Sequence, residues 1–416
     1  MNVVIVGPFW FPHGSASAAR VRNLALGLQE CGARVHVMGM APQPPWNGGS
    51  RSGVLEYQGI SYEYVAPTVA VTDGWRDADR SIPRLRNRLV DKVRWFAGLY
   101  GATLFACRRL RERIDQGRCD LLVAYDRSAL RMTPIVRLCR ARGVTSVLDV
   151  VEVSEHLMRS RMNALYWDSL AGTRATPRLF DGLTVITAGL EELYRARGCP
   201  NTLVVPSIEE WPPAPAPAPT GNPEFRLAYV GRFPPRDAPE MLIGAMRILA
   251  HQGLPIVLDV IGHYEGTERG RHFARVCTED PVLGRAVRFH GSLSDAALAE
   301  RLASSDGLVL TRRRARTEEL SFPTRLVEYL RYGRPVFVSD VGDVSRYLRH
   351  RREAVLLHPS EPASIAASIA EVVCRPDRGV EMGHRGREAG ARSFNRRTHA
   401  ARLLGFAAGL RVESAA

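Results

Sequence analysis

Residues 211–223 read WPPAPAPAPTGNP, and this stretch divides the chain into two parts of similar length. A run so rich in proline favours an extended polyproline conformation and cannot pack as a core helix. We therefore expect a linker over 211–224, an N-terminal domain over 1–210 and a C-terminal domain over 225–395, with a final helix and tail over 396–416. A chain of 416 residues is also longer than one ordinary domain.

Before the linker, short apolar runs alternate with segments of helical length. A strand is expected at Val3–Val6, then a loop that contains glycine, an amphipathic helix, and a second strand at Val35–Met38. Further strands are expected at Leu121–Ala124, Ser146–Asp149, Leu183–Ile186 and Leu203–Val205. This order is typical of a parallel sheet that helices cover on both faces.

After the linker the pattern starts again. A strand is expected at Leu227–Val230, a helix near Pro239–Leu249, and further strands at Ile256–Ile261, Ala286–Phe289, Gly307–Leu310 and Pro335–Val338. The predicted fold class is α/β, with two Rossmann-like domains that face each other across a cleft and a C-terminal helix that can cross back to the first domain. Open parallel sheets bind ligands beyond the carboxyl ends of their strands, so the cleft is the expected site.

The charge balance favours anionic partners. Lys and Arg number 57 against 43 Asp and Glu, a net charge of +14, and Lys92 is the only lysine. A Walker-type lysine is therefore absent, and anion binding falls to arginine, whose planar guanidinium suits phosphate. Nucleic acid, anionic membranes and phosphorylated substrates are all compatible with this charge. Dispersed arginines and an aromatic content of 7% disfavour nucleic acid.

The cysteine pattern favours a reducing compartment. The seven cysteines are scattered and odd in number, so neither a disulfide scaffold nor a zinc site is predicted. The first residues lack the features of a signal peptide, and no apolar run reaches membrane-spanning length. We expect a cytoplasmic protein, either free or peripheral on the inner face of the membrane. The absence of a D-x-D motif and of clustered His, Cys and Asp predicts metal independence.

Residues 318–343, EELSFPTRLVEYLRYGRPVFVSDVGD, are the most informative segment. Pro323 suits the first turn of a helix, where free amides and the helix dipole favour an anion. Arg325 lies in that turn, and Glu328 follows three positions later on the same face. The pair offers a cation for a phosphate and a carboxylate for a ribose diol. The alternative is an ordinary amphipathic helix with an intrahelical ion pair.

The same segment resembles a motif of glycosyltransferase family 4, whose members have the GT-B fold. The motif is P-x-K-L-x-E-Y-x-x-x-G-x-P-V-V, and residues 323–337 read PTRLVEYLRYGRPVF. The resemblance implies a retaining transferase that uses a nucleoside diphosphate sugar as donor and no other cofactor. It places Glu328 on the ribose and Arg325 near the diphosphate, within a donor site that also includes Ser321, Phe322, Pro323 and Thr324.

The sequence departs from the family at the partner glutamate eight positions before Glu328, because Leu320 stands there. Glu319 or Glu318 could replace that glutamate after a small shift of the loop. The residue that replaces the partner glutamate would recognise the hydroxyls of the donor's sugar.

A second segment, YVGRFPPRDAPEMLIGAMRIL from Tyr229, resembles the family's G-R-[LF]-x-P-x-K-G sequence. Gly231 permits close backbone approach at a strand end. The resemblance implies that Arg232 binds the diphosphate of the donor. The family's lysine falls on Asp237, which leaves Arg236 as its replacement. Each arginine could instead be an ordinary surface residue.

Two further segments complete the expected donor site. The N-terminal loop GPFWFPHGSASAAR is similar to the family's glycine-containing loop, with Gly14 for close approach and Ser15 or Ser17 as helix cap. The segment VRFHGSLSDAALAERLASSDGLVL, from Val287, places a nucleobase near His290 if the resemblance holds.

The acceptor side has weaker signals. In LDVVEVSEHL, from Leu148, Glu152 follows a strand where family members often carry an acid or histidine. Glu152 therefore joins Arg232 and Arg325 as a candidate catalytic residue, the alternative being a solvated loop carboxylate. Asp126 and Arg127 rank below it.

Residues 84–113 place nine basic residues around the apolar stretch VRWFAGLYGATLFA. Interfacial helices on anionic lipid have this composition, and a lipid-linked acceptor would then be plausible. A docked helix with solvated arginines, and a soluble small-molecule acceptor, are the alternative.

The predicted activity is transfer of a sugar from a nucleoside diphosphate sugar to an acceptor hydroxyl. One alternative is a non-catalytic protein on a GT-B scaffold that binds polyanions or a membrane surface. A sugar-nucleotide epimerase or dehydrogenase is disfavoured, because no Y-x-x-x-K pair can form around Lys92 and no G-x-G-x-x-G is present.

Overall fold

The computed structural model describes residues 1–41, 53–65, 88–152, 164–213, 220–358 and 361–415. The chain forms two compact units. Unit 1 comprises Met1–Glu210 together with Arg396–Ala416, and unit 2 comprises Trp211–Asn395.

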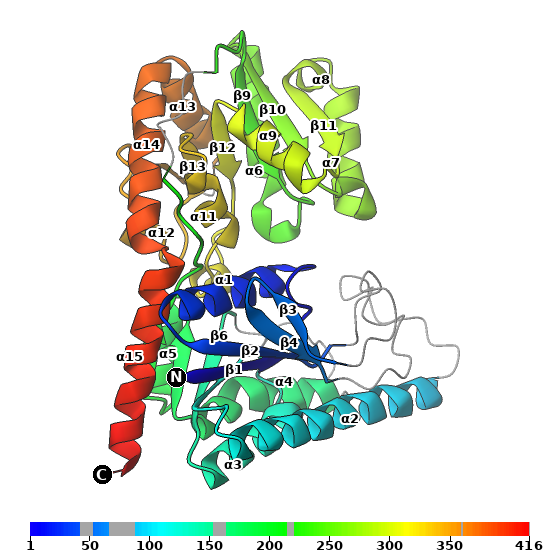
Figure 1. Ribbon diagram of the computed structural model, residues 1–416. Coiled ribbons are helices and arrows are strands. Elements are labelled where there is room, and N and C mark those ends of the chain that lie inside the picture. The colour runs from blue at the N-terminus through cyan, green and yellow to red at the C-terminus, as the bar shows by residue number, and fades with distance from the viewer. Residues whose placement is uncertain (42–52, 66–87, 153–163, 214–219, 359–360, 416) are drawn as a thin grey trace. The chain divides into compact units, whose positions relative to one another are not determined.

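Unit 1 is built on an eight-stranded sheet in the order β3-β4-β2-β1-β5-β6-β7-β8. Figure 1 labels β1 to β4 and β6 of this sheet. All neighbouring strands are parallel except β3 and β4. The strands are β1 (Asn2–Gly7), β2 (Arg34–Gly39), β3 (Leu55–Tyr57), β4 (Ile60–Tyr64), β5 (Leu121–Ala124), β6 (Thr145–Val150), β7 (Gly182–Val185) and β8 (Thr202–Val204). The strands predicted from apolar runs therefore exist, with ends that differ by a residue or two.

The β3–β4 hairpin is an element that the apolar pattern did not predict. Its turn is formed by Gln58 and Gly59, with φ of 49° and 80°, the left-handed pair that two-residue hairpins favour. Its strands are short and carry polar residues on the edge of the sheet, so they lack the apolar run that marks a buried parallel strand.

Six α-helices and one 3₁₀ turn accompany this sheet among the described residues. They are α1 (Ala16–Glu30), α2 (Arg88–Asp115), α3 (Ala129–Ala141), α4 (Ala164–Arg174), η2 (Thr176–Leu179), α5 (Ala188–Ala196) and α15 (Arg396–Ala415). The C-terminal helix α15 packs against α1 and also reaches β6 and β7. A Cβ at Gly27 of α1 would lie 2.6 Å from the carbonyl oxygen of Arg396, so glycine permits this helix contact.

Unit 2 is built on a six-stranded sheet that is parallel throughout, in the order β11-β10-β9-β12-β13-β14. The strands are β9 (Phe225–Val230), β10 (Ile256–Ile261), β11 (Val287–Gly291), β12 (Gly307–Leu310), β13 (Val336–Ser339) and β14 (Val355–Leu357). Numbered within the unit, this is the order 3-2-1-4-5-6 of a dinucleotide-binding Rossmann sheet.

The helices of unit 2 alternate with its strands. They are η3 (Pro235–Asp237), α6 (Pro239–His251), η4 (Tyr264–Gly266), α7 (Glu268–Glu279), α8 (Leu283–Ala286), α9 (Asp295–Ala303), α10 (Arg316–Glu319), α11 (Thr324–Arg331), α12 (Val344–Tyr347), α13 (Pro362–Val373) and α14 (Pro376–Ser393). The core lies between the sheet and helices such as α6 and α13, and it includes the fully buried rings of Tyr229, Phe233 and Phe337.

Candidate functional site

The order of strands in unit 2 marks one edge of its sheet as the candidate ligand site. Strands β9 and β12 are neighbours, and from this pair the remaining strands extend in opposite directions. Loops that leave two such strands diverge and leave a crevice at their carboxyl ends. The segments after β9 and β12 are the two segments that the sequence motifs occupy.

The loop after β9 depends on glycine. A Cβ at Gly231 would collide with the hydroxyl of Tyr229, and a Cβ at Gly262 would lie 2.5 Å from the carbonyl oxygen of Gly231. Gly262 also has φ of 131°, which other residues rarely adopt. The ends of β9 and β10 therefore approach each other as backbone against backbone.

Arg232 follows Gly231 with an exposed side chain. The next residue, Phe233, has φ of 53° and a fully buried ring that stacks on Tyr229 at 4.8 Å between centroids. A positive φ at a phenylalanine is unfavourable and persists only where packing imposes it. The buried ring thus anchors the loop, while Arg232 stays at the surface beyond the strand end.

Asp237 occupies the position of the family's lysine, and the structure gives it a structural role. Its carboxylate is buried and accepts a hydrogen bond from the Tyr229 hydroxyl at 2.6 Å, and its carbonyl oxygen accepts one from the Thr311 hydroxyl at 2.6 Å. Burial raises the pKa of Asp237, against the opposing effect of Tyr229 and nearby arginines. Arg236 beside it is exposed, and its carbonyl oxygen accepts from the amide of Arg313 at 2.8 Å.

Helix α11 is attached to the end of β9 by two side chains one turn apart. Arg325 donates a hydrogen bond from Nη1 to the carbonyl oxygen of Val230, and the hydroxyl of Tyr329 accepts from the amide of Val230 at 2.9 Å. Pro323 is the N-cap, so the helix begins one residue later than predicted, at Thr324. Arg325 is thereby brought next to the Gly231 loop.

Glu328 follows one turn after Arg325 on α11. The helix buries Leu326, Val327, Tyr329 and Leu330, whereas Arg325 and Glu328 remain half-buried. A guanidinium and a carboxylate three residues apart therefore share the less buried side of this short helix. Such a pair can contact a phosphate and a diol at the same edge of the sheet.

A buried ion pair supports the loop that precedes α11. Arg312, two residues beyond β12, donates to Glu318 at 2.6 Å and to the hydroxyl of Ser321 at 3.3 Å. The two charged side chains are 10% and 11% exposed. Ser321 thus has a partner inside the protein. Arg312 was not predicted as a site residue, although its place after a strand end was the same signal that selected Glu152.

The remaining candidates of this loop have different surroundings. Glu319 accepts a hydrogen bond from the amide of Gly342 at 3.1 Å and pairs with Arg314 at 3.3 Å. The ring of Phe322 is buried against Tyr347 and Phe394, and Thr324 is exposed at the helix start. Phe322 therefore holds the loop from the core side.

His290 lies at the carboxyl end of β11, two strands away from β9. Its Nε2 is 2.6 Å from Oδ1 of Asp259, a buried residue of β10. Gly262 connects this region to the site, because its amide donates to the carbonyl oxygen of Gly291 at 2.7 Å. The half-buried His290 ring is thus oriented by an acid beneath it.

The candidates of unit 1 lie at the carboxyl ends of its own strands. Gly14 has φ of 116°, and Ser15 is the N-cap of α1, where its hydroxyl accepts from the amide of Ala18 at 3.2 Å. Glu152 is exposed just beyond β6, and its carbonyl oxygen accepts from Arg127. Glu155 and His156, which follow Glu152 in the segment LDVVEVSEHL, lie outside the described residues.

A buried pair near Glu152 was not predicted. Arg20 of α1 contacts Asp149 of β6 through two hydrogen bonds of 2.7 Å, and the carboxylate also accepts from Thr184 at 2.8 Å. Burial lowers the pKa of Arg20, but the charge and hydrogen bonds of Asp149 have the larger effect. The pKa of Arg20 is therefore raised. This bidentate pair fixes α1 to the sheet of unit 1.

Two classes of feature are absent from the part of the chain that the structure describes. It contains no group of three or more His, Cys, Asp or Glu residues arranged to hold a metal ion. No helix in the same ranges has the length and apolar character that crossing a membrane requires.

Comparisons with known proteins agree with this geometry. Residues 224–375 match the family model described as glycosyl transferases group 1. None of the curated proteins matches this chain.

Solved structures are similar over almost the whole length. Sucrose-phosphate synthase from Thermosynechococcus elongatus has 17% identity and a TM-score of 0.70, with 99% of each chain covered. HepE from Anabaena, in complex with UDP, has 14% identity and a TM-score of 0.68, covering 97% of this chain and 100% of its own. WaaG, a glycosyltransferase involved in lipopolysaccharide biosynthesis, has 14% identity and a TM-score of 0.60, covering 96% and 98%. At these identities the likeness concerns the fold.

The α/β fold of this chain is therefore that of the GT-B glycosyltransferases, and its residues 224–375 match the family model of the glycosyl transferases group 1.

Proposed function

We propose that this protein transfers a sugar from a nucleoside diphosphate sugar to an acceptor hydroxyl. The observation that carries the proposal is the attachment of Arg325 to Val230, which brings α11 to the end of β9 beside Gly231 and Arg232. This arrangement lies within the residues that match the group 1 family. Structures of HepE contain UDP, and one contains UDP-glucose, which favours a uridine nucleotide sugar as donor.

The proposed roles follow from charge and position. Arg232 and Arg325 bind the diphosphate and stabilise the charge that develops as it leaves, together with the first amides of α11. Glu328 accepts hydrogen bonds from the ribose hydroxyls. Arg236 adds positive charge at the rim of the site, and Glu319 stands where a sugar hydroxyl could be recognised.

We propose family 4-like hexosyl transfer with retention and without a metal ion or other cofactor. Arginines and helix amides at the sheet edge offer the positive charge that a metal supplies elsewhere. On the acceptor side, Glu152 is the candidate acid, and its exposure is compatible with contact to a substrate.

We further propose that α2 contacts an anionic membrane surface on the cytoplasmic side, where a lipid-linked acceptor would be accessible. Among the residues whose side chains are described, Leu104 and Phe105 are 62% and 48% exposed. Arg108 and Arg111, one and two turns later, are also exposed. Exposed apolar side chains flanked by arginines are typical of interfacial helices.

The experiment is a transfer and donor-hydrolysis assay with a panel of nucleoside diphosphate sugars, in buffer with and without a chelator. Arg232→Ala should lower kcat/KM by about 100-fold, the effect of removing one contact to a developing charge. Glu328→Ala should lower kcat/KM through a higher KM for the donor, because it removes the acceptor of the ribose hydroxyls. Arg275→Ala, which removes an exposed arginine of α7, is the matched control and should keep the wild-type rate.

Two results would contradict the proposal. A wild-type protein that is inert towards every donor would favour the non-catalytic alternative, a binding protein on the same scaffold. Activity that disappears with a chelator and returns with a divalent cation would refute the metal-free part alone.

A further inference from the structure

Unit 2 contains a basic pocket outside the candidate donor site, lined by residues of α13, of the first ten positions of α14, of β14 and of the turn before β14. Its volume is about 270 Å³, and four arginines and two glutamates are among the residues that line it. None of these residues belongs to the candidate donor site. The charged residues are Arg351, Arg375, Arg378, Arg385, Glu371 and Glu381.

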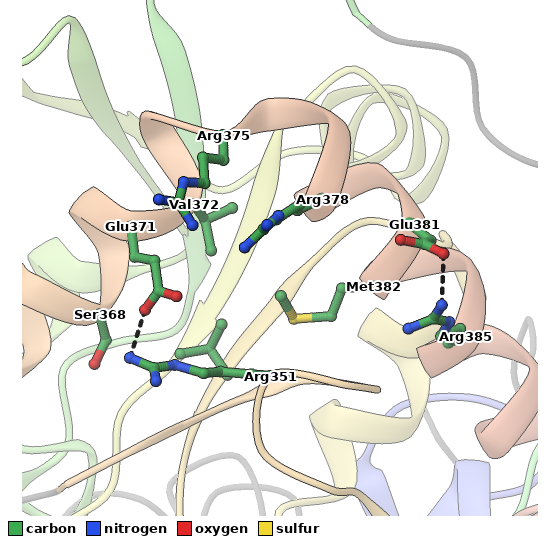
Figure 2. Close-up of a pocket in the computed structure, with 10 residues that line it drawn as sticks. Arg351, Ser368, Glu371, Val372, Arg375, Arg378, Glu381, Met382 and Arg385 are labelled. Atoms are coloured by element: carbon green, nitrogen blue, oxygen red, sulfur yellow. Dashed lines mark hydrogen bonds and ion pairs between the residues drawn. The ribbon is translucent and has the colours of Figure 1, made fainter.

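The two glutamates neutralise two of the four arginines. Arg351 pairs with Glu371 at 2.6 Å, and Arg385 pairs with Glu381 at 2.5 Å. Figure 2 shows Arg378 between these two pairs, above Met382, and Arg375 above the Arg351–Glu371 pair. Among the described residues, neither of these two side chains has a hydrogen bond or ion pair. Within the described ranges, the pocket therefore keeps two positive charges that have no ion-pair partner.

The floor of the pocket is apolar. Val355, Val372 and Met382 line it and are all buried, with exposed fractions of 2%, 5% and 7%. In Figure 2 the Met382 side chain lies below Arg378, between the two ion pairs. Thioether side chains adapt their shape to different apolar groups. A ligand that contacts both the arginines and the apolar floor needs an anionic group on an apolar body.

The backbone conformation of Arg351 also supports a binding role for this pocket. Its φ is 60°, a left-handed conformation that costs energy in arginine and is easily adopted by glycine. Its amide donates to the carbonyl oxygen of Ala354 at 2.8 Å, which fixes the turn before β14. A long cation is thus held on the pocket rim despite the cost of its backbone conformation.

We propose that this pocket binds a small molecule that carries a phosphate monoester on an apolar body. A phosphate monoester has close to two negative charges at neutral pH, which match the two unbalanced arginines. Guanidinium groups bind phosphate oxygens in bidentate fashion, and the apolar floor receives the rest of the molecule. A volume of about 270 Å³ accommodates a ligand of this size.

The test uses phenyl phosphate as probe and the full-length protein. Hydrogen exchange with and without the probe should show protection in residues 351–385 of the pocket. In the same experiment, hydrogen exchange in residues 229–237 and 318–343 shows whether the probe also binds at the candidate donor site. The variant Arg375→Ala/Arg378→Ala should bind the probe about tenfold more weakly, since it removes the two guanidinium groups available to the phosphate.

The matched control is Arg275→Ala/Arg285→Ala, which removes two exposed arginines of unit 2 outside the pocket and changes the net charge equally. It should bind phenyl phosphate like the wild type. Orthophosphate should bind more weakly than phenyl phosphate, because it leaves the apolar floor uncovered. The proposal is overturned if the pocket shows no protection, or if both double variants lose affinity equally.

Discussion

The buried ion pair between Arg312 and Glu318 allows a quantitative prediction about the loop that leads into α11. The charged atoms are 2.6 Å apart, and about nine-tenths of each side chain is removed from solvent. Glu318→Ala leaves the Arg312 guanidinium buried without its counter-charge. Breaking a buried pair in this way costs about 3 kcal/mol. For a domain the size of unit 2, that loss lowers Tm by roughly 6 to 12 °C.

The assay is thermal unfolding followed by circular dichroism, together with the KM for the donor. The loss of Glu318 also removes a hydrogen-bond partner of Ser321, so the loop is less well positioned and KM should rise. The control is Arg312→Met/Glu318→Leu, which replaces both charges with apolar groups and should be more stable than Glu318→Ala. A Glu318→Ala protein that melts within about 1 °C of the wild type, or a double variant less stable than the single one, would refute this reasoning.

Three further predictions concern other parts of the molecule. Burial opposes ionisation of Glu63, but His36 and then Arg109 outweigh that effect and lower the pKa of Glu63 from 4.5 to about 2. The ionised group therefore stabilises the fold above pH 4.5, and this stability is lost as the pH falls towards 2. Glu63→Gln should accordingly flatten the acid side of a profile of Tm against pH. Gly262→Ala should lower stability by about 1 to 3 kcal/mol and weaken donor binding, measured by urea unfolding and titration calorimetry, because a Cβ there meets the backbone of the preceding strand loop. Leu104→Ser/Phe105→Ser should reduce sedimentation with phosphatidylglycerol vesicles but not the transfer rate to a soluble acceptor, and unchanged sedimentation would contradict the proposed membrane contact.

The sequence predicts most of the fold because parallel strands that are buried on both faces leave continuous apolar runs. The run at Ile256–Ile261 corresponds to β10 without any shift. The β3–β4 hairpin escaped prediction because its short strands mix apolar and polar residues at one end of the sheet. Strand β14 escaped because its apolar run, Val355–Leu357, is only three residues long. Whether such a short segment forms a strand therefore depends on its neighbours in the sheet, which only the tertiary structure reveals.

The site was predictable where the chemistry is local and less so where it depends on packing. The spacing of Arg325 and Glu328 is visible in the sequence, as is the glycine at 231. The attachment of Arg325 to Val230 joins residues that are 95 positions apart, so no spacing rule reveals it. The role of Asp237 was equally hidden in the sequence, because its burial against Tyr229 follows from the strained loop around Phe233.

The most direct test of the central claim is a crystal structure of the full-length protein with bound UDP. The account predicts the diphosphate against Arg232 and the first turn of α11, with the guanidinium of Arg325 beside it and the ribose hydroxyls on Glu328. A nucleotide bound at another edge of the sheet, with Arg232 and Arg325 directed away from its phosphates, would contradict the account.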